Sequence, residues 1–102
     1  MELHPRTKIE IVIAADAADR VVAIVDRSGA TGYTVVGEVS GKGGRGLRES
    51  ADPLGILSNV MVIVVCAREV ADRIVAGVMS ELGSYPCAVF VSDVRVVREE
   101  QF

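Results

Sequence analysis

The segment best suited to chemistry is glycine-rich and lies near the middle of the chain, at Gly41-Lys42-Gly43-Gly44-Arg45-Gly46. Glycines have no side chain, so their backbone N–H groups can approach an anion closely and form a concave nest of donors. Lys42, Arg45 and the nearby Arg48 add positive charge in an otherwise acidic protein. A phosphate group is the ligand that these features would suit best. The alternative is a flexible surface loop with solvated charges.

The same letters match the pattern G-x-G-x-x-G of dinucleotide-binding proteins. That interpretation requires the motif to follow a strand and to open a helix. Here residues 47–53 read LRESADP, and the next clear element is a strand. The sequence therefore does not predict a Rossmann site.

A second pair of cations, Arg95 and Arg98, lies near the end of the chain. By themselves these arginines are best interpreted as a solvated strand edge, where cations discourage unwanted pairing. His4 is the only histidine, so one chain cannot supply a Ser-His-Asp, Cys-His or histidine-rich metal site. Cys66 and Cys87 lie in apolar stretches and are expected to fill the core. The pattern favours binding over catalysis.

Composition restricts the class of protein further. The chain has 102 residues with a net charge of −3, so we expect one domain and no nucleic-acid partner. It has two Phe, two Tyr and no Trp, which weakens a base-stacking platform. The longest apolar run, at residues 60–67, is far below the roughly 20 residues that span a bilayer, and no apolar signal segment precedes it. We expect a soluble cytoplasmic protein without membrane insertion.

Hydrophobic periodicity predicts the elements that must position these residues. A loose leader over residues 1–7 precedes the domain, which spans residues 8–98. Asp16 or Asp19 is expected to open the first helix by accepting from free N–H groups, and Ser28-Gly29 to end it. Gly37 is expected to mark a bulge. The expected strands are residues 8–14, 33–39, 58–66 and 86–92, with an extended tail at 94–98; the expected helices are residues 16–28 and 67–82, and residues 40–57 form a long loop.

This order predicts an α+β fold, a ferredoxin-like βαββαβ sandwich with both helices on one face of an antiparallel sheet. The third strand, at residues 58–66, is apolar on both faces. Because helices cover only one face, another copy of the chain is expected to cover the other. The alternative is a lone domain with an exposed apolar patch.

The succession Gly32-Tyr33-Thr34-Val35-Val36, then Glu38-Val39, then the glycine-rich loop and an apolar strand resembles the PII signalling superfamily. These are trimeric ferredoxin-like proteins that bind adenine nucleotides between neighbouring subunits. Their long loop between the second and third strands is called the T-loop, and here it corresponds to residues 40–57.

The resemblance implies nucleotide-binding roles for particular residues. Gly32 and Thr34 would line the adenine and ribose, and Val64 lies on the strand whose backbone reads the adenine edge. The C-terminal Arg95 and Arg98 would reach phosphates. The base of the T-loop would wrap the phosphates with Gly41, Lys42, Gly43, Gly44 and Arg45.

Departures from the family pattern refine the ligand. The common phosphate-gripping lysine before the last core strand is missing from residues 82–87, LGSYPC, which favours ADP or AMP over ATP. Arg45 stands where nitrogen-sensing members have a glutamine that helps to hold Mg-ATP and 2-oxoglutarate, which argues against 2-oxoglutarate sensing. No Tyr lies between residues 41 and 57, so uridylylation is not expected, and Ser50 is a weak phosphorylation candidate.

The loop is most similar to the PII-like subgroup linked to inorganic carbon, which includes carboxysome-associated proteins. That likeness implies bicarbonate as a second ligand at Gly41, Lys42, Gly43 and Arg45. The expected function is a non-catalytic sensor whose T-loop orders on binding and controls a protein partner in inorganic-carbon metabolism. Two alternatives stand beside it. One is a structural trimer of the same fold, similar to divalent-ion tolerance proteins or a carboxysome component. The other is a small acylphosphatase-like enzyme, which the sequence Ala14-Ala15-Asp16 disfavours.

Overall fold

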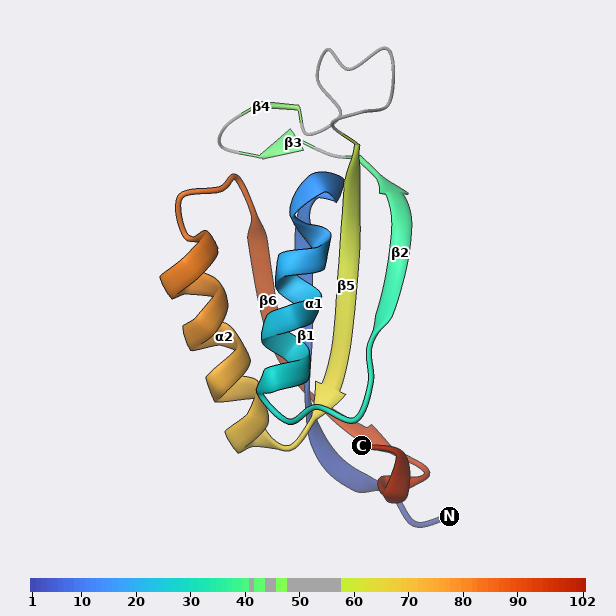
Figure 1. The fold of residues 1–102 in the computed structure, drawn as a ribbon. Coiled ribbons are helices and arrows are strands. Elements are labelled where there is room, and N and C mark those ends of the chain that lie inside the picture. Colours follow the sequence, from blue (N-terminus) through green and yellow to red (C-terminus); the bar gives the residue numbers. More distant parts are fainter. Residues whose placement is uncertain (41, 44–45, 48–57) are drawn as a thin grey trace.

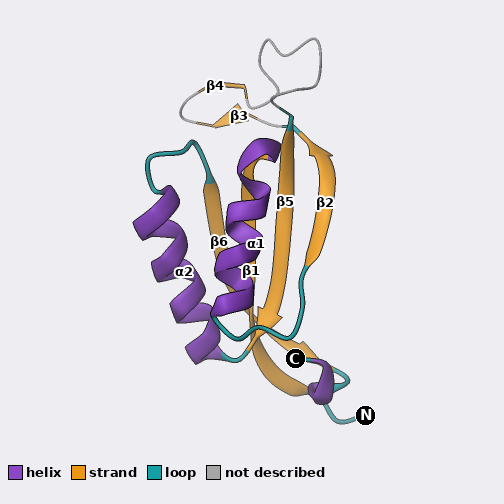
Figure 2. Cartoon of the chain, viewed as in Figure 1, coloured by secondary structure: helices purple, strands orange, loops and turns teal. Residues whose placement is uncertain are grey.

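The computed structural model describes residues 1–40, 42–43, 46–47 and 58–102. Four strands form one antiparallel sheet in the order β2-β5-β1-β6. Both helices pack on the same face of this sheet (Figure 1; Figure 2), which confirms the α+β, ferredoxin-like βαββαβ fold. The elements in chain order are β1 (His4–Ala14), η1 (Ala15–Ala17), α1 (Ala18–Arg27), β2 (Thr34–Val39), β3 (Lys42–Gly43), β4 (Gly46–Leu47), β5 (Asn59–Cys66), α2 (Arg68–Leu82), β6 (Ala88–Val96) and η2 (Glu99–Gln101).

The core lies between the helices and one face of the central strands. Alternation along β1 places three isoleucines on this face, and all three are fully buried. Their strand neighbours on the same face, Val62 and Val64, are equally buried opposite Ile11 and Ile9. The buried helix residues that cover them are Val21, Ile24 and Val25 from α1 and Ala71, Ile74, Val78 and Leu82 from α2.

The first strand is longer than its sequence predicts. The expected loose leader is wrong for residues 4–7, because β1 begins at His4 and pairs with the end of β6, from His4 opposite Val96 to Thr7 opposite Asp93. The last strand likewise runs without interruption from Ala88 to Val96, so the predicted break after residue 92 is wrong. Residues 4–7 and residues 93–96 both include polar side chains, and the two segments form strands because they pair with each other.

The helix ends follow the prediction only in part. Gly29 has φ 98° just beyond α1, which confirms the glycine stop. The expected capping by Asp16 or Asp19 is wrong, since neither η1 nor α1 has a side-chain cap hydrogen bond. Both carboxylates lie in first turns, where a negative charge still favours the helix dipole. Gly83 ends α2 at φ −63°, in the right-handed region.

A bulge interrupts β2 where Gly37 predicted one. The register of the β2–β5 ladder shifts between Val36 and Val39. The left-handed residue is Glu38, at φ 56°, and not the glycine. The irregularity re-aims the chain just before it leaves the sheet.

Candidate functional site

The base of the glycine-rich segment and the terminal arginines lie at opposite ends of the sheet. At one end Val39 lies opposite Asn59, where the chain leaves β2 for the glycine-rich segment. At the other end Arg95 lies opposite Pro5, beyond the level at which Thr7 meets Cys66. Seven strand steps separate Asn59 from Cys66, which is roughly 23 Å at strand spacing. One chain therefore holds the base of its glycine-rich segment far from its terminal arginines (Figure 1).

Gly32 and Thr34 lie at the start of β2 and are both exposed. A Cβ added to Gly32 would meet nothing within 4 Å, so the absence of a side chain leaves open space there. Thr34 lies opposite Ile63, on the sheet face that no helix covers. Thr34 is thus exposed beside the apolar Ile63, and an adenine ring requires apolar contact of this kind.

Val64 has a different position from the other predicted residues. Its side chain is fully buried and packs among the core residues on the helix side of the sheet. Only its backbone could contribute to a ligand site, as the prediction for this strand supposed.

Arg95 and Arg98 are exposed, and within the described part of the chain neither forms an ion pair. Arg95 lines an open hollow of about 630 Å³ between the β1–β6 ribbon and the first turn of α2. Arg68 lines the same hollow, is exposed and is equally unpaired among the described residues. Glu69 and Asp93 bring opposite charge to its wall. Arg68 was not predicted as a site residue, although it is the second residue of the predicted helix at 67–82.

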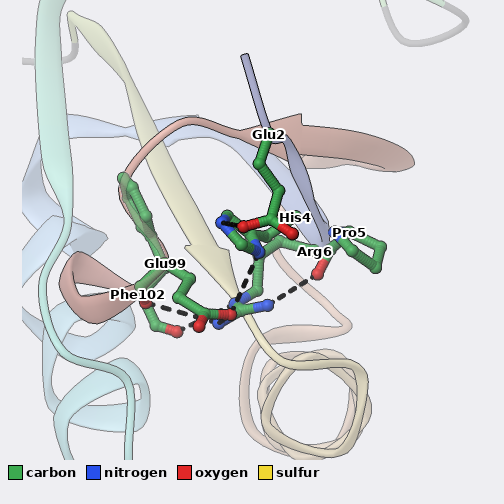
Figure 3. Close-up of polar contacts among 6 residues, drawn as sticks. All are labelled: Glu2, His4, Pro5, Arg6, Glu99 and Phe102. Atoms are coloured by element: carbon green, nitrogen blue, oxygen red, sulfur yellow. Dashed lines mark hydrogen bonds and ion pairs between the residues drawn. The ribbon is translucent and has the colours of Figure 1, made fainter.

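A cluster at the base of β1 was also missed. Arg6 donates from Nε to the backbone oxygen of Phe102 at 3.1 Å and from Nη2 to that of Glu99 at 3.3 Å (Figure 3). The Nδ1 atom of His4 lies 3.2 Å from a carboxylate oxygen of Glu99. His4 and Arg6 share one face of β1 by strand alternation, and that spacing was the available signal.

The glycine-rich segment is described in part. Lys42 and Gly43 form β3, which pairs with Gly46 and Leu47 of β4. The predictions for Gly41, Gly44, Arg45 and Ser50, and for residues 48–57 as a whole, lie outside the described residues.

The sheet face away from the helices is uncovered in the single chain and is apolar apart from Thr34, Ser92 and the Lys8–Glu10 ion pair. Ladder register aligns Phe90, Glu10, Ile63 and Thr34 across this face, with Val36, Met61, Val12 and Ala88 in the next row. Phe90 is 56 % exposed and Val36 is 40 % exposed. An apolar surface of this kind on a sheet marks an interaction site.

Other chemistry finds little support in the described residues. Burial raises the pKa of the Cys66 thiol, and the nearby Arg73 guanidinium offsets part of that shift. A buried thiol of this kind stays protonated, as expected for a core residue. No group of three metal-ligating side chains occurs among the residues that the structure describes. In the same part of the chain, neither helix has the length and hydropathy to cross a membrane.

A family model for the nitrogen regulatory protein P-II matches residues 6–101 of the chain. Among solved structures, the PII-like protein CPII from Thiomonas intermedia, bound to ADP, AMP and bicarbonate, superposes with a TM-score of 0.89 at 29% identity. That match covers 99% of this chain and 96% of CPII. CPII bound to ADP and bicarbonate matches at 31% identity with a TM-score of 0.87, covering 99% and 97% of the two chains.

A protein of Thermus thermophilus, described as a PII-like signalling protein, matches at 31% identity with a TM-score of 0.82. The match covers 100% of this chain and 99% of the Thermus protein. The similarity therefore extends over the whole length of both chains, including the two segments that hold Gly32 and Arg98.

Proposed function

The chain belongs to the nitrogen regulatory P-II family, and from that premise we propose that it is a regulatory protein that binds ADP or AMP between the subunits of a homotrimer. The proposal rests above all on the separation of the two candidate groups in one chain. Arg95 and Arg98 lie far from the base of the glycine-rich segment, and Thr34 lies about midway, opposite Ile63. A second chain can bring its own segment to them.

The exposed apolar sheet face supports the assembly. Burial of apolar surface contributes roughly 25 cal/mol per Å², and this face has Phe90, Val36 and the half-buried Met61 and Ile63 to offer. Contact through the same face of each copy suits a closed symmetric oligomer. Trimers are typical of the family.

The charges support a phosphate-bearing ligand. Arg95 and Arg98 have no ion pair among the described residues, so a phosphate would not have to displace an internal partner. Adenine would lie against the surface at Gly32 and Thr34 and the backbone near Val64. The phosphates would then meet the arginines and the segment at Gly41, Lys42, Gly43, Gly44 and Arg45 of the neighbouring subunit.

CPII was crystallised with bicarbonate as well as ADP, which supports bicarbonate as a second ligand here. A small planar anion suits backbone donors and an arginine fork. We assign it to Gly41, Lys42, Gly43 and Arg45, beside the nucleotide phosphates. Ligand binding would order residues 40–57, the T-loop, and so control its contact with a protein partner in inorganic-carbon metabolism, in the cytoplasm or at the carboxysome.

Calorimetry of the full chain with ADP, AMP and ATP, with and without bicarbonate, tests the function. We expect ADP and AMP to bind more tightly than ATP. Arg98→Ala should weaken ADP binding by about 1–3 kcal/mol, the value of a charged hydrogen bond. Arg20→Ala is the matched control, because Arg20 is also exposed but contacts Tyr85 on the helix side. A trimer without heat or thermal shift at millimolar adenylate would instead be a structural protein of this fold.

A further inference from the structure

The segment that follows β6 folds back onto the start of β1. Arg6 donates to two backbone oxygens of this segment, those of Phe102 and Glu99. The Glu99 carboxylate oxygen Oε2 lies 3.2 Å from Nδ1 of His4 and 3.9 Å from Nη2 of Arg6 (Figure 3). One carboxylate therefore contacts both His4 and Arg6 of β1, and we call residues His4, Arg6 and Glu99 the terminal clamp.

The clamp is partly shielded from solvent. The His4 and Arg6 side chains are 22% and 20% exposed, whereas the Glu99 side chain is 57% exposed. Partial burial of His4 and Arg6 reduces screening at these two residues, whereas solvent still screens the exposed Glu99 carboxylate. The clamp can therefore hold residues 97–102 against the start of β1.

The clamp fixes the backbone next to a proposed ligand residue. The Gln101 N–H donates to the Arg98 oxygen at 3.2 Å, and the Phe102 N–H donates to the Glu99 oxygen at 3.1 Å. Arg98 directly precedes η2, and η2 is the element that the clamp holds. The backbone that follows Arg98 is thus held by contacts with residues near the start of the sequence.

His4 contacts the clamp carboxylate through its imidazole ring. Its ring lies between two carboxylates, with Nε2 3.9 Å from Glu2 and Nδ1 3.2 Å from Glu99. Arg6 is the opposing cation at the same Glu99 oxygen, and Val96, the strand partner of His4, is uncharged. A neutral ring has one N–H, whereas an imidazolium has two and adds an attractive charge. Histidine is the side chain that makes this change between pH 5 and 8.

We propose that His4, Arg6 and Glu99 are positioning residues that hold Arg98 for the nucleotide, and that protonation of His4 tightens the hold. Mild acid then favours the ligand-binding arrangement, and loss of the proton loosens it. The effect on nucleotide affinity rests on the function proposed above, whereas the clamp itself does not.

The ligand-free protein tests the clamp. In a pH titration followed by NMR, the amide resonances of Gln101 and Phe102 should shift with the same midpoint as the His4 ring. Both shifts should vanish in His4→Gln and persist in Glu100→Gln, a matched control at an exposed neighbouring carboxylate. Amide resonances that do not move with His4, or that move equally in His4→Gln, would overturn the proposal. Glu99→Gln should also abolish the coupling and serves if His4→Gln folds poorly.

ADP affinity tests the consequence. The ratio of affinities at pH 5.5 and pH 8 should be about two- to fivefold larger in the wild type than in His4→Gln, as expected for a partly exposed ion pair. Protonation of ADP itself affects both proteins alike and cancels in this comparison. Equal ratios, with amide shifts that follow His4, would disprove the link to Arg98. If ADP binds at neither pH 5.5 nor pH 8, the proposed function and this link are wrong. The NMR titration then still decides whether the clamp exists.

Discussion

Gly77 of α2 faces Ile24 of α1 so closely that a Cβ atom at position 77 would lie 2.8 Å from the Ile24 Cγ2 atom. The Arg27 guanidinium would be 3.3 Å from the same Cβ, and Arg27 pairs with Glu81 across the two helices. The glycine is thus what allows the helices to share one face of a small sheet.

Gly77→Ala should therefore destabilise the protein. Overpacking costs about 1–3 kcal/mol, against a gain in helix propensity of about 1 kcal/mol, so we expect a net loss of up to about 2 kcal/mol. Urea denaturation measures the change. Ser80→Ala, at an exposed position of the same helix, is the control and should be neutral or slightly stabilising. A Gly77→Ala variant as stable as the wild type would mean that α1 and α2 separate at little cost.

Phe90→Ser should break the trimer, because it removes the most exposed aromatic side chain from the uncovered sheet face. Met79→Ser is a matched control, since Met79 is 52% exposed against 56% for Phe90 but lies on α2. Light scattering at low micromolar concentration should show a monomer for Phe90→Ser and a trimer for Met79→Ser. A trimer in both variants would place the interface elsewhere.

Gly32→Ala should weaken adenylate binding without affecting the fold. A Cβ there enters open space within the chain, so only a ligand or a neighbouring subunit would meet it. Gly37→Ala is the control on the same edge, because its Cβ also meets nothing within 4 Å. Thermal unfolding should be similar for the two, while calorimetry should show reduced ADP affinity for Gly32→Ala alone. Equal affinities would remove Gly32 from the site.

The Cys66 thiol should resist alkylation in the native protein. Burial raises its pKa, so the reactive thiolate is rare at pH 8. Iodoacetamide should modify the half-buried Cys87 first, as peptide mass analysis can show. Rapid modification of Cys66 would indicate that β5 opens readily.

The same shift predicts how stability depends on pH. A raised pKa favours the protonated thiol in the folded state, so this stabilisation is complete below the ordinary thiol pKa. It is lost as the pH rises through the folded-state value, with a slope of at most about 1.4 kcal/mol per pH unit. Denaturation of the wild type and Cys66→Val between pH 7 and pH 10 should show an extra alkaline loss in the wild type alone. Parallel curves would contradict it.

Short-range patterns predicted most of the fold. A few neighbouring residues are enough to predict β1, from the alternation of Ile9, Ile11 and Ile13, and the end of α1, from the glycine that follows it. The pairing of His4 with Val96 does not, because polar residues around Pro5 look like a loose leader until a distant strand supplies partners. Long-range pairing therefore explains both wrong strand boundaries.

The residues of the candidate site stay a prediction. Arg95 and Arg98 stood out by charge and by family resemblance, and the structure leaves both unpaired among the described residues. The contact between Arg6 and Phe102 joins residues 96 positions apart, so no local pattern could predict it. In the sequence, Arg6 is only one more cationic residue near the start of the chain.

The distance between the β2–β5 end and the terminal arginines has a genetic consequence. In the proposed ring, every molecule gives its cations to one cleft and its loop to the next. Two inactive variants, one lacking Arg98 and one lacking Lys42, would then complement each other when expressed together. In a mixed trimer, some clefts would combine the intact Arg98 of one variant with the intact Lys42 of the other.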